Sequence, residues 1–81
     1  MAGADVRALV EDVVRGLVGQ PDAVRVDAVE RARMLVVEVR VAPEDVGKVI
    51  GRRGRVIAAL RTVARTAAAR TGRRVHVEIV Q

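Results

Sequence analysis

Apolar residues in the first part of the chain recur with the period of an α-helix. They stand at intervals of three and four residues and would line one face of an amphipathic helix: Val6, Leu9, Val10, Val13, Val14 and Leu17. A run of turn-forming residues, Gly19-Gln20-Pro21-Asp22, ends this pattern. The pattern therefore predicts an N-terminal helix with one buried face.

Two strands are predicted next. Val24, Val26 and Ala28 alternate with more polar residues, which indicates a strand. Residues 30–33 are polar and would form the turn. The stretch Met34–Val41 alternates and is rich in β-branched residues, as strands are. The two strands are close enough in sequence to form a hairpin.

The second half predicts two helices and a last strand. Pro43 suits the first position of a short helix over residues 43–50, and Glu44 and Asp45 suit its first turn. Gly51 ends that helix. After a turn, a longer helix over 55–69 ends by Gly72, and alternation over 73–80 predicts the final strand. One face of the longer helix carries Val56, Ile57, Leu60, Val63, Ala64, Ala67 and Ala68.

The order α-β-β-α-α-β over 81 residues, without a linker or repeat, predicts one α+β domain spanning 1–81. We expect two layers, with the helices packed on one face of a three-stranded sheet. The chain has no cysteine, which fits a reducing cytoplasm. Residues 1–12 contain Asp5 and no apolar run, so they predict no signal peptide, and no segment is apolar enough for a membrane span.

Positive charge is concentrated in the second half of the chain. Residues 1–42 carry six basic and seven acidic side chains, whereas residues 43–81 carry nine basic and three acidic ones. No acid occurs between Val46 and Val77. Such one-sided charge indicates a polyanionic partner; a solubilising surface is the alternative, but it would usually carry interspersed acids.

The most informative segment within this basic region is Gly51-Arg52-Arg53-Gly54. Glycines allow a sharp turn and the close approach of a partner's backbone, and arginines between them would point outward as forks suited to phosphate oxygens. The helix that follows adds free N–H groups and a partial positive charge. The segment therefore predicts a phosphate-binding loop suited to a nucleic-acid backbone.

Residues 49–57, Val-Ile-Gly-Arg-Arg-Gly-Arg-Val-Ile, resemble the Ile-Gly-x-x-Gly-x-x-Ile signature that lies between two helices in KH domains. The order of elements resembles the type II KH fold. The segments at 42–47 and 75–80 are similar to those of the small bacterial KH-domain RNA-binding protein A family, KhpA. The resemblance covers essentially the whole chain.

This resemblance implies single-stranded RNA binding, in which the loop clamps about four nucleotides of backbone. It implies that residues 51–54 hold phosphates, that Lys48 and Arg55 add charge on either side, and that Val49, Ile50 and Ile57 lie around an aliphatic groove. The strand at 34–41 could form the opposite wall. Ile50 and Ile57 could equally be core residues.

Enzymatic chemistry is not indicated. The only histidine, His76, lacks partners at metal-ligand spacing, so we expect no metal and no cofactor. There is no serine, no nucleophile–base arrangement, and no Gly-Lys-Ser/Thr ending of a nucleotide-binding loop. The chain also lacks Phe, Tyr and Trp, which disfavours modules that stack bases on aromatic side chains.

Three functions remain open. The leading one is a non-catalytic RNA-binding protein, a post-transcriptional regulator or RNA chaperone. The family also implies an interaction module that pairs with itself or with a larger KhpB (Jag/EloR)-type KH protein, a pairing linked to cell elongation and division. Alanines 67–69 could permit close helix contact in such a pair. Single-stranded DNA binding is the weakest alternative.

Overall fold

The computed structural model describes residues 2–81, and it confirms the predicted order of helices and strands in an α+β fold. The helices and strands are α1 (Ala2–Leu17), β1 (Arg25–Arg31), β2 (Met34–Arg40), α2 (Val46–Ile50), α3 (Arg55–Ala69) and β3 (Arg74–Ile79). Single turns of 3₁₀-helix occur at Pro21–Ala23, Pro43–Asp45 and Arg52–Gly54.

The sheet combines antiparallel and parallel pairing in the order β1-β2-β3. β1 and β2 form a hairpin in which Val26 faces Val39, whereas β2 and β3 run parallel with Val37 beside Val77. Parallel strands need a long crossover connection. Here that connection consists of α2, the glycine-bracketed loop and α3, so the topology places the loop at one end of the sheet.

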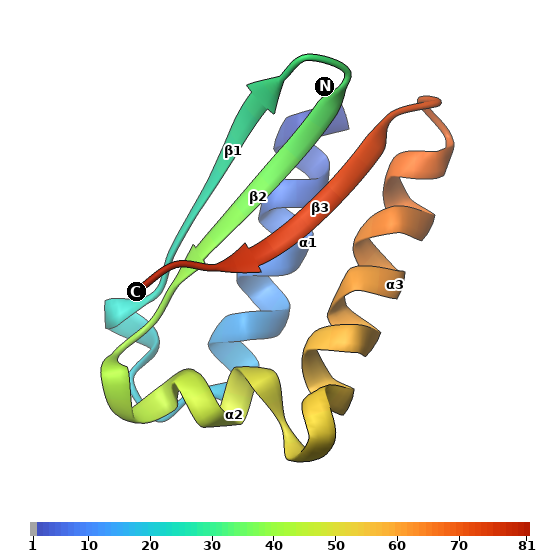
Figure 1. Cartoon of the computed structure of the whole chain (residues 1–81). Coiled ribbons are helices and arrows are strands. Elements are labelled where there is room, and N and C mark those ends of the chain that lie inside the picture. Colours follow the sequence, from blue (N-terminus) through green and yellow to red (C-terminus); the bar gives the residue numbers. More distant parts are fainter. Residues whose placement is uncertain (1) are drawn as a thin grey trace.

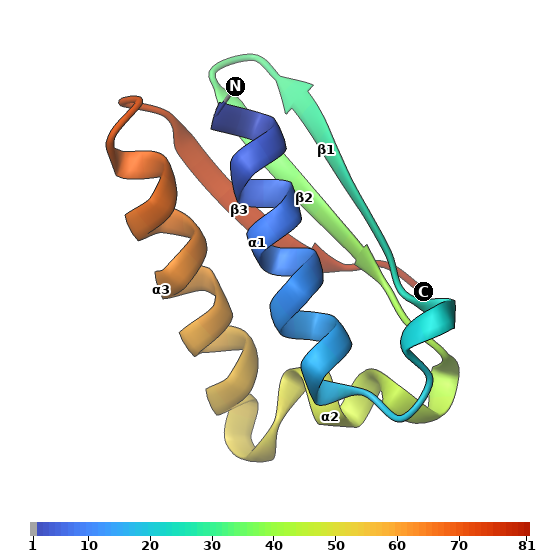
Figure 2. The same ribbon diagram turned by 180° about the vertical axis from the view of Figure 1, so that it is seen from behind.

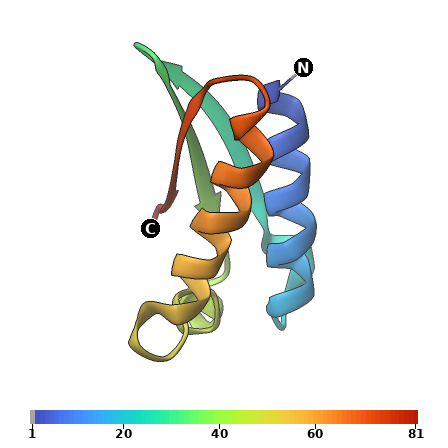
Figure 3. The ribbon, with the colours of Figure 1, turned by 90° about the vertical axis from the view of Figure 1, so that its right-hand side faces the viewer.

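Two of the three helices form the second layer. α1 and α3 run side by side across one face of the sheet, and the other face is left open (Figures 1 and 2). The view from the side separates the sheet from these two helices (Figure 3). α2 lies across the lower end of the domain in Figure 1. The predicted two layers are present, with α2 closing one end instead of covering the sheet.

The core between the layers consists of small aliphatic side chains. In β2, Leu35, Val37 and Val39 are buried against the helices, as the alternation predicted, but Val36 is buried as well, with 7% of its surface exposed. α1 contributes Val6, Val10 and Val14 to this core, and α3 contributes Ile57, Leu60, Ala64 and Ala68. With no aromatic ring in the chain, close packing of the helices depends on alanine at positions such as Ala64, which is fully buried.

Three local predictions differ from the structure. The turn predicted over residues 30–33 is shorter, because β1 continues to Arg31 and only two residues, starting with Ala32 at a φ of 52°, connect the strands. The helix predicted over 43–50 divides into a 3₁₀ turn and α2. The apolar face of α1 is only partly buried: Leu9, Val13 and Leu17 remain exposed. The sheet and α3 cover only part of the circumference of α1.

No helix within residues 2–81 is long and apolar enough to cross a lipid bilayer.

Candidate nucleic-acid interface

The loop between α2 and α3 is a tight turn that requires glycine at its first position. Gly51 has a φ of 76°, which side chains rarely tolerate. Its N–H donates to the Gly47 carbonyl at 2.9 Å and ends α2, and its carbonyl accepts from the Gly54 N–H at 3.1 Å. A Cβ at residue 51 would lie 2.8 Å from the Val56 amide nitrogen. Any other residue here would force α2 and α3 apart.

The second half of the turn has left-handed backbone at two successive residues. Gly54 has a φ of 71° and Arg53 a φ of 57°. For an arginine this conformation costs on the order of 1 kcal/mol. The cost is borne at a residue whose side chain is exposed, not packed.

The arginines of the loop carry uncompensated charge. Arg52, Arg53 and Arg55 are all exposed, and among the described residues no carboxylate lies within 4.0 Å of their guanidinium groups. α3 starts at Arg55 without a side-chain cap, so the positive end of its dipole lies at the same place. The helix dipole and the exposed arginine side chains both favour an anion at this position.

Lys48 differs from these arginines because it has an acidic partner. Its Nζ lies 3.2 Å from a carboxylate oxygen of Asp45, while about half of its side chain remains exposed. Its charge is therefore partly neutralised by the protein, and it contributes less to the local field than Arg52 or Arg53.

Asp45 is the buried carboxylate of the domain, with 1% of its surface exposed. It accepts hydrogen bonds from the Gly19 N–H at 3.1 Å and from the Gln20 N–H at 3.0 Å. The Gly19 hydrogen bond is the main cause of a lowered pKa; Gln20 and Lys48 lower it further, and burial opposes them. Asp45 lies in the first turn as predicted, but its side chain connects the segment after α1 to the start of α2.

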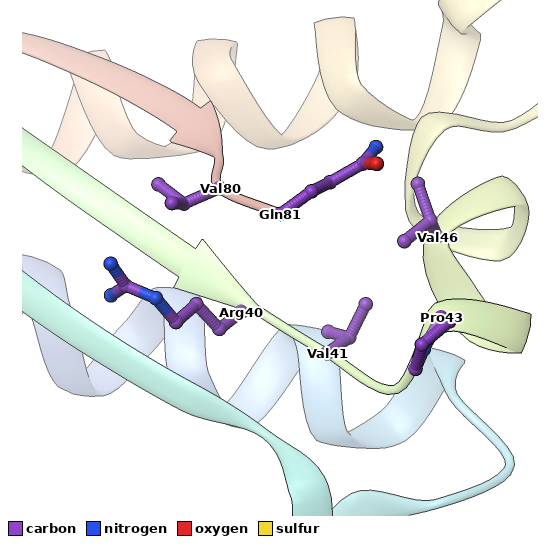
Figure 4. A pocket seen from close by; sticks show the side chains of 6 residues that line it. All are labelled: Arg40, Val41, Pro43, Val46, Val80 and Gln81. Atoms are coloured by element: carbon purple, nitrogen blue, oxygen red, sulfur yellow. The ribbon is translucent and has the colours of Figure 1, made fainter.

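A hollow lies along α2, beside the ends of β2 and β3 (Figure 4). Its volume is about 470 Å³, and it is lined by Arg40, Val41, Pro43, Val46, Val80 and Gln81. Val46 and Ile50 are four residues apart and so lie on the same side of α2. Because 38% of the Ile50 surface is exposed, this side chain extends the apolar surface from the hollow toward the loop.

The three apolar residues predicted around the groove have different exposures. Ile50 is exposed, Ile57 retains 8% of its surface, and Val49 is completely buried. Val49 and Ile57 support the loop from the core side in this structure. The loop, Lys48, Arg55 and Ile50 are brought together on the surface at the lower end of the domain.

Sequence reasoning did not single out Val46, Val80 or Gln81. They meet because β3 runs parallel to β2, and the Val80 N–H continues the pairing by donating to the Val39 carbonyl at 2.9 Å. The predicted wall, the strand at 34–41, contributes only its end, at Arg40 and Val41. The four-residue spacing of Val46 and Ile50, which places both on one side of a helix, is the sequence feature that could have predicted this apolar surface.

No metal site accompanies this surface: within residues 2–81, no three His, Asp or Glu side chains come together in a way that could hold an ion.

Residues 7–79 match the family model described as the KH domain of KhpA and KhpB. The chain belongs to this family. It is 44% identical over 72 residues to the RNA-binding protein KhpA of Caldanaerobacter subterraneus, covering 89% of this chain and 96% of that protein. It is 54% identical over 68 residues to KhpA of Leifsonia xyli (84% and 87% covered) and 51% identical over 71 residues to KhpA of Mycobacterium tuberculosis (88% and 85% covered).

A solved structure shows the same fold in a different context. A crystal structure of Aquifex aeolicus Era bound to GDP.AlF4− superposes with a TM-score of 0.63 over 91% of this chain at 22% identity. The match covers 29% of the Era chain. At this identity the likeness concerns the fold alone, and it shows the KhpA/KhpB fold as one part of a longer chain.

Proposed function

We propose that the chain binds single-stranded RNA by clamping its backbone in the loop at residues 51–54. The observation that carries the proposal is the pair of exposed arginines, Arg52 and Arg53, without a carboxylate partner among the described residues, in a turn bracketed by two glycines at the start of α3. Arg55 adds a third such cation. KhpA relatives are named RNA-binding proteins, which supports the same ligand.

The bases would lie on the apolar surface formed by Ile50, Val46 and Val80 next to the loop. Aliphatic side chains offer little hydrogen-bonding discrimination, and contacts to phosphate position a strand without identifying its sequence. With no aromatic side chain to stack on, we expect weak sequence preference. Duplex RNA does not suit this mode, because its bases are not free to enter a groove.

The proposed role is non-catalytic and cytoplasmic, and it needs no cofactor or metal. A protein that holds the backbone with weak sequence preference suits a post-transcriptional regulator or RNA chaperone. The further link to cell elongation and division rests on the family resemblance.

The test reverses the charge of the loop. In Arg52→Asp/Arg53→Asp, two charge-assisted hydrogen bonds of about 1.5 kcal/mol or more each are lost, so affinity for an unstructured RNA should fall at least about 100-fold. Both side chains are exposed, so the fold should survive. Fluorescence anisotropy measures the affinity, and far-UV circular dichroism with thermal unfolding measures the fold.

The matched control is Arg15→Asp on α1, which changes one exposed cation whose partner is Glu11. It should bind RNA within a few-fold of wild type. Wild-type affinity in the folded double variant would refute the clamp. A loss in Arg15→Asp half as large, on a logarithmic scale, as in the double variant would reduce the loop to a contribution to net charge, because the control reverses one charge and the double variant two.

A second candidate function, self-association, is favoured by one further observation. Leu9, Val13 and Leu17 form an exposed apolar row on α1, and Val63 on α3 is also exposed, at 40%. Between them lies a hollow of about 310 Å³ with an almost wholly apolar lining, bordered by Arg55 at the loop end. We propose that a second copy covers this row, so that small residues of α3 contribute less than the sequence predicted.

Concentration-dependent stability tests this candidate. If pairing occurs, the midpoint of thermal unfolding should rise with protein concentration, and analytical centrifugation should show a dimer. Val13→Asp should abolish both effects while RNA binding by the loop remains. A wild-type protein that stays monomeric at high micromolar concentration would exclude the homodimer, and pull-down with a KhpB-type protein would then test a heteromer.

A further inference from the structure

Five arginines gather at the end of the domain opposite the loop. They come from the β1–β2 turn, from the end of α3 and from the start of β3, and we call them the upper arginine cluster: Arg31, Arg33, Arg65, Arg73 and Arg74. The β1–β2 turn and the α3–β3 turn both lie at the upper end in Figure 1, whereas the loop lies at the lower end. The length of α3, about 22 Å, separates the two ends.

The cluster surrounds two adjoining hollows that share Met34 and Arg74. The hollow on the hairpin side, about 540 Å³, also has Arg31, Arg33 and Val36 along it, and the hollow on the helix side is about 370 Å³. Arginines are among the lining residues of both. The lining between them is mainly apolar, with Met34, Val36 and Val75 among its residues.

The charge of the cluster is only partly compensated. Arg73 pairs with Glu30, and Arg31 lies 3.7 Å from Glu38. For Arg33, Arg65 and Arg74, no carboxylate among the described residues lies within 4.0 Å. The cluster therefore resembles the loop in having three unpartnered guanidinium groups close together on an exposed surface.

One further arginine lies between the two ends. Arg61 is half-buried on α3, and its Nε donates to the Val77 carbonyl of the edge strand β3 at 3.1 Å. Arg65 lies one turn further along α3. Arg55, Arg61 and Arg65 thus follow one another along α3, from the loop toward the upper arginine cluster.

We propose that the upper arginine cluster is a second RNA-backbone site, which a strand reaches when it extends beyond the nucleotides held by the loop. This inference rests on the proposed function of the loop. Arginine side chains bind phosphates, and the apolar lining between them accepts a base or sugar. The hollows therefore match a nucleotide chain better than a flat lipid surface or an acidic peptide. Binding by the domain then depends on RNA length.

The test compares unstructured RNAs of two lengths. An oligonucleotide of about five nucleotides fills the loop site alone, whereas one of about 15 nucleotides can reach both ends. In Arg33→Gln/Arg74→Gln, affinity for the short RNA should stay within twofold of wild type. Affinity for the long RNA should fall about three- to tenfold, as expected for two exposed charge contacts. The slope of log affinity against log salt should flatten by about 1.4 for the long RNA only.

Two control variants accompany the pair. Arg33→Lys/Arg74→Lys keeps the charge and should retain most of the affinity for the long RNA, and Arg15→Gln removes one cation on α1 and should change neither affinity. The side chains of Arg33 and Arg74 are exposed, and neither donates a hydrogen bond among the described residues. The variants should therefore fold as wild type does.

Unchanged affinity of the Gln pair for the long RNA would overturn the proposal, as would equal losses for both lengths. Loss of binding to phosphatidylglycerol vesicles without any change in RNA affinity would assign the cluster to a lipid surface instead. The proposed function is tested separately by the short RNA with wild type and with Arg52→Asp/Arg53→Asp. Its failure would appear as absent short-RNA binding, independently of the cluster variants.

Discussion

The two halves of the chain use arginine in different ways. In residues 1–42, four of the six cations have a carboxylate partner within 4.0 Å among the described residues: Arg7, Arg15, Arg31 and Arg40. In residues 43–81, only Lys48 and Arg73 of nine do. Paired cations on a surface add little net field, and such pairs contribute on the order of 0–1 kcal/mol to stability. Unpaired cations leave a field that a polyanion can use.

The difference arises from where the acids are. Glu11 lies between Arg7 and Arg15 on α1. Arg40 has Asp27 across the β1–β2 hairpin and Glu38 on its own strand. The acid that precedes the loop most closely in sequence is Asp45, which is buried and occupied by Gly19, Gln20 and Lys48. The available positive charge therefore depends on the placement of carboxylates more than on the number of arginines.

Among changes that leave every charge in place, the largest effect should come from the first glycine of the loop. Gly51→Ala would place a Cβ against Val56 at a φ of 76°, at a cost of roughly 1–3 kcal/mol. The midpoint of thermal unfolding should fall by about 4–8 °C for each kcal/mol, and RNA affinity should fall at least about tenfold because the arginines are no longer held in the turn.

Gly47→Ala is the matched control for this change. Its Cβ would meet no atom within 4 Å, and alanine favours a helix, so stability should stay equal or rise. If Gly51→Ala bound RNA and unfolded as wild type does, the turn geometry would not matter and only the surplus of cations would distinguish the two halves.

Asp45→Asn should destabilise the domain at neutral pH. The amide carries no charge, and its nitrogen, which replaces one carboxylate oxygen, cannot accept a hydrogen bond. The folded protein lowers the pKa of Asp45 below its ordinary 3.8, so the carboxylate stabilises the fold above that pH and the contribution is lost as the pH falls through the lowered pKa. Urea unfolding at pH 7 and near pH 3 measures this.

The expected result is a lower midpoint for Asp45→Asn than for wild type at pH 7, with the difference shrinking in acid. Glu44→Gln, at the neighbouring exposed residue, should change neither midpoint. A difference between Asp45→Asn and wild type that stayed constant from pH 7 to pH 3 would contradict the role given to the carboxylate charge.

The salt dependence of RNA affinity should distinguish cations of the two halves by a smaller effect. If roughly three to five phosphates are contacted, the log–log slope for an unstructured strand should be about −2 to −3.5, and Arg52→Gln/Arg53→Gln should flatten it by about 1.4. Arg15→Gln, in the half whose cations are mostly paired, should leave the slope unchanged. Affinity measured from low to high salt shows this, and a flat wild-type response would contradict backbone binding.

The smallest effect should come from relieving left-handed backbone. Arg53 and Ala32 both have positive φ values, 57° and 52°. Glycine at either position should raise the free energy of unfolding by about 0.5 kcal/mol. Only Arg53→Gly should also weaken RNA binding. Equal RNA affinity in both variants would show that Arg53 contributes nothing beyond its backbone conformation.

Periodicity predicted most of the elements well because each depends on local pattern. α3 occupies residues 55–69 as predicted, since apolar spacing defines its buried side and Gly54 and Gly72, both with positive φ, bound it. The division of residues 43–50 into a 3₁₀ turn and a five-residue helix was not predictable in this way. The hydrogen bonds from Gly19 and Gln20 to Asp45 come from the segment between α1 and β1, about 25 residues earlier in the chain, and no local pattern records them.

The order of elements, the charge surplus of the second half and the glycine-bracketed arginine turn can be read from the sequence, because they depend on residue type and spacing along the chain. The remaining features depend on how distant segments pack in three dimensions. Parallel pairing of β3 with β2 brought Val80 beside Val46. The packing of α1 left Leu9 and Val13 exposed, and the crossover through α2 and α3 divided one run of cations between opposite ends of the domain. Contacts between residues distant in sequence select among arrangements that the local pattern permits equally.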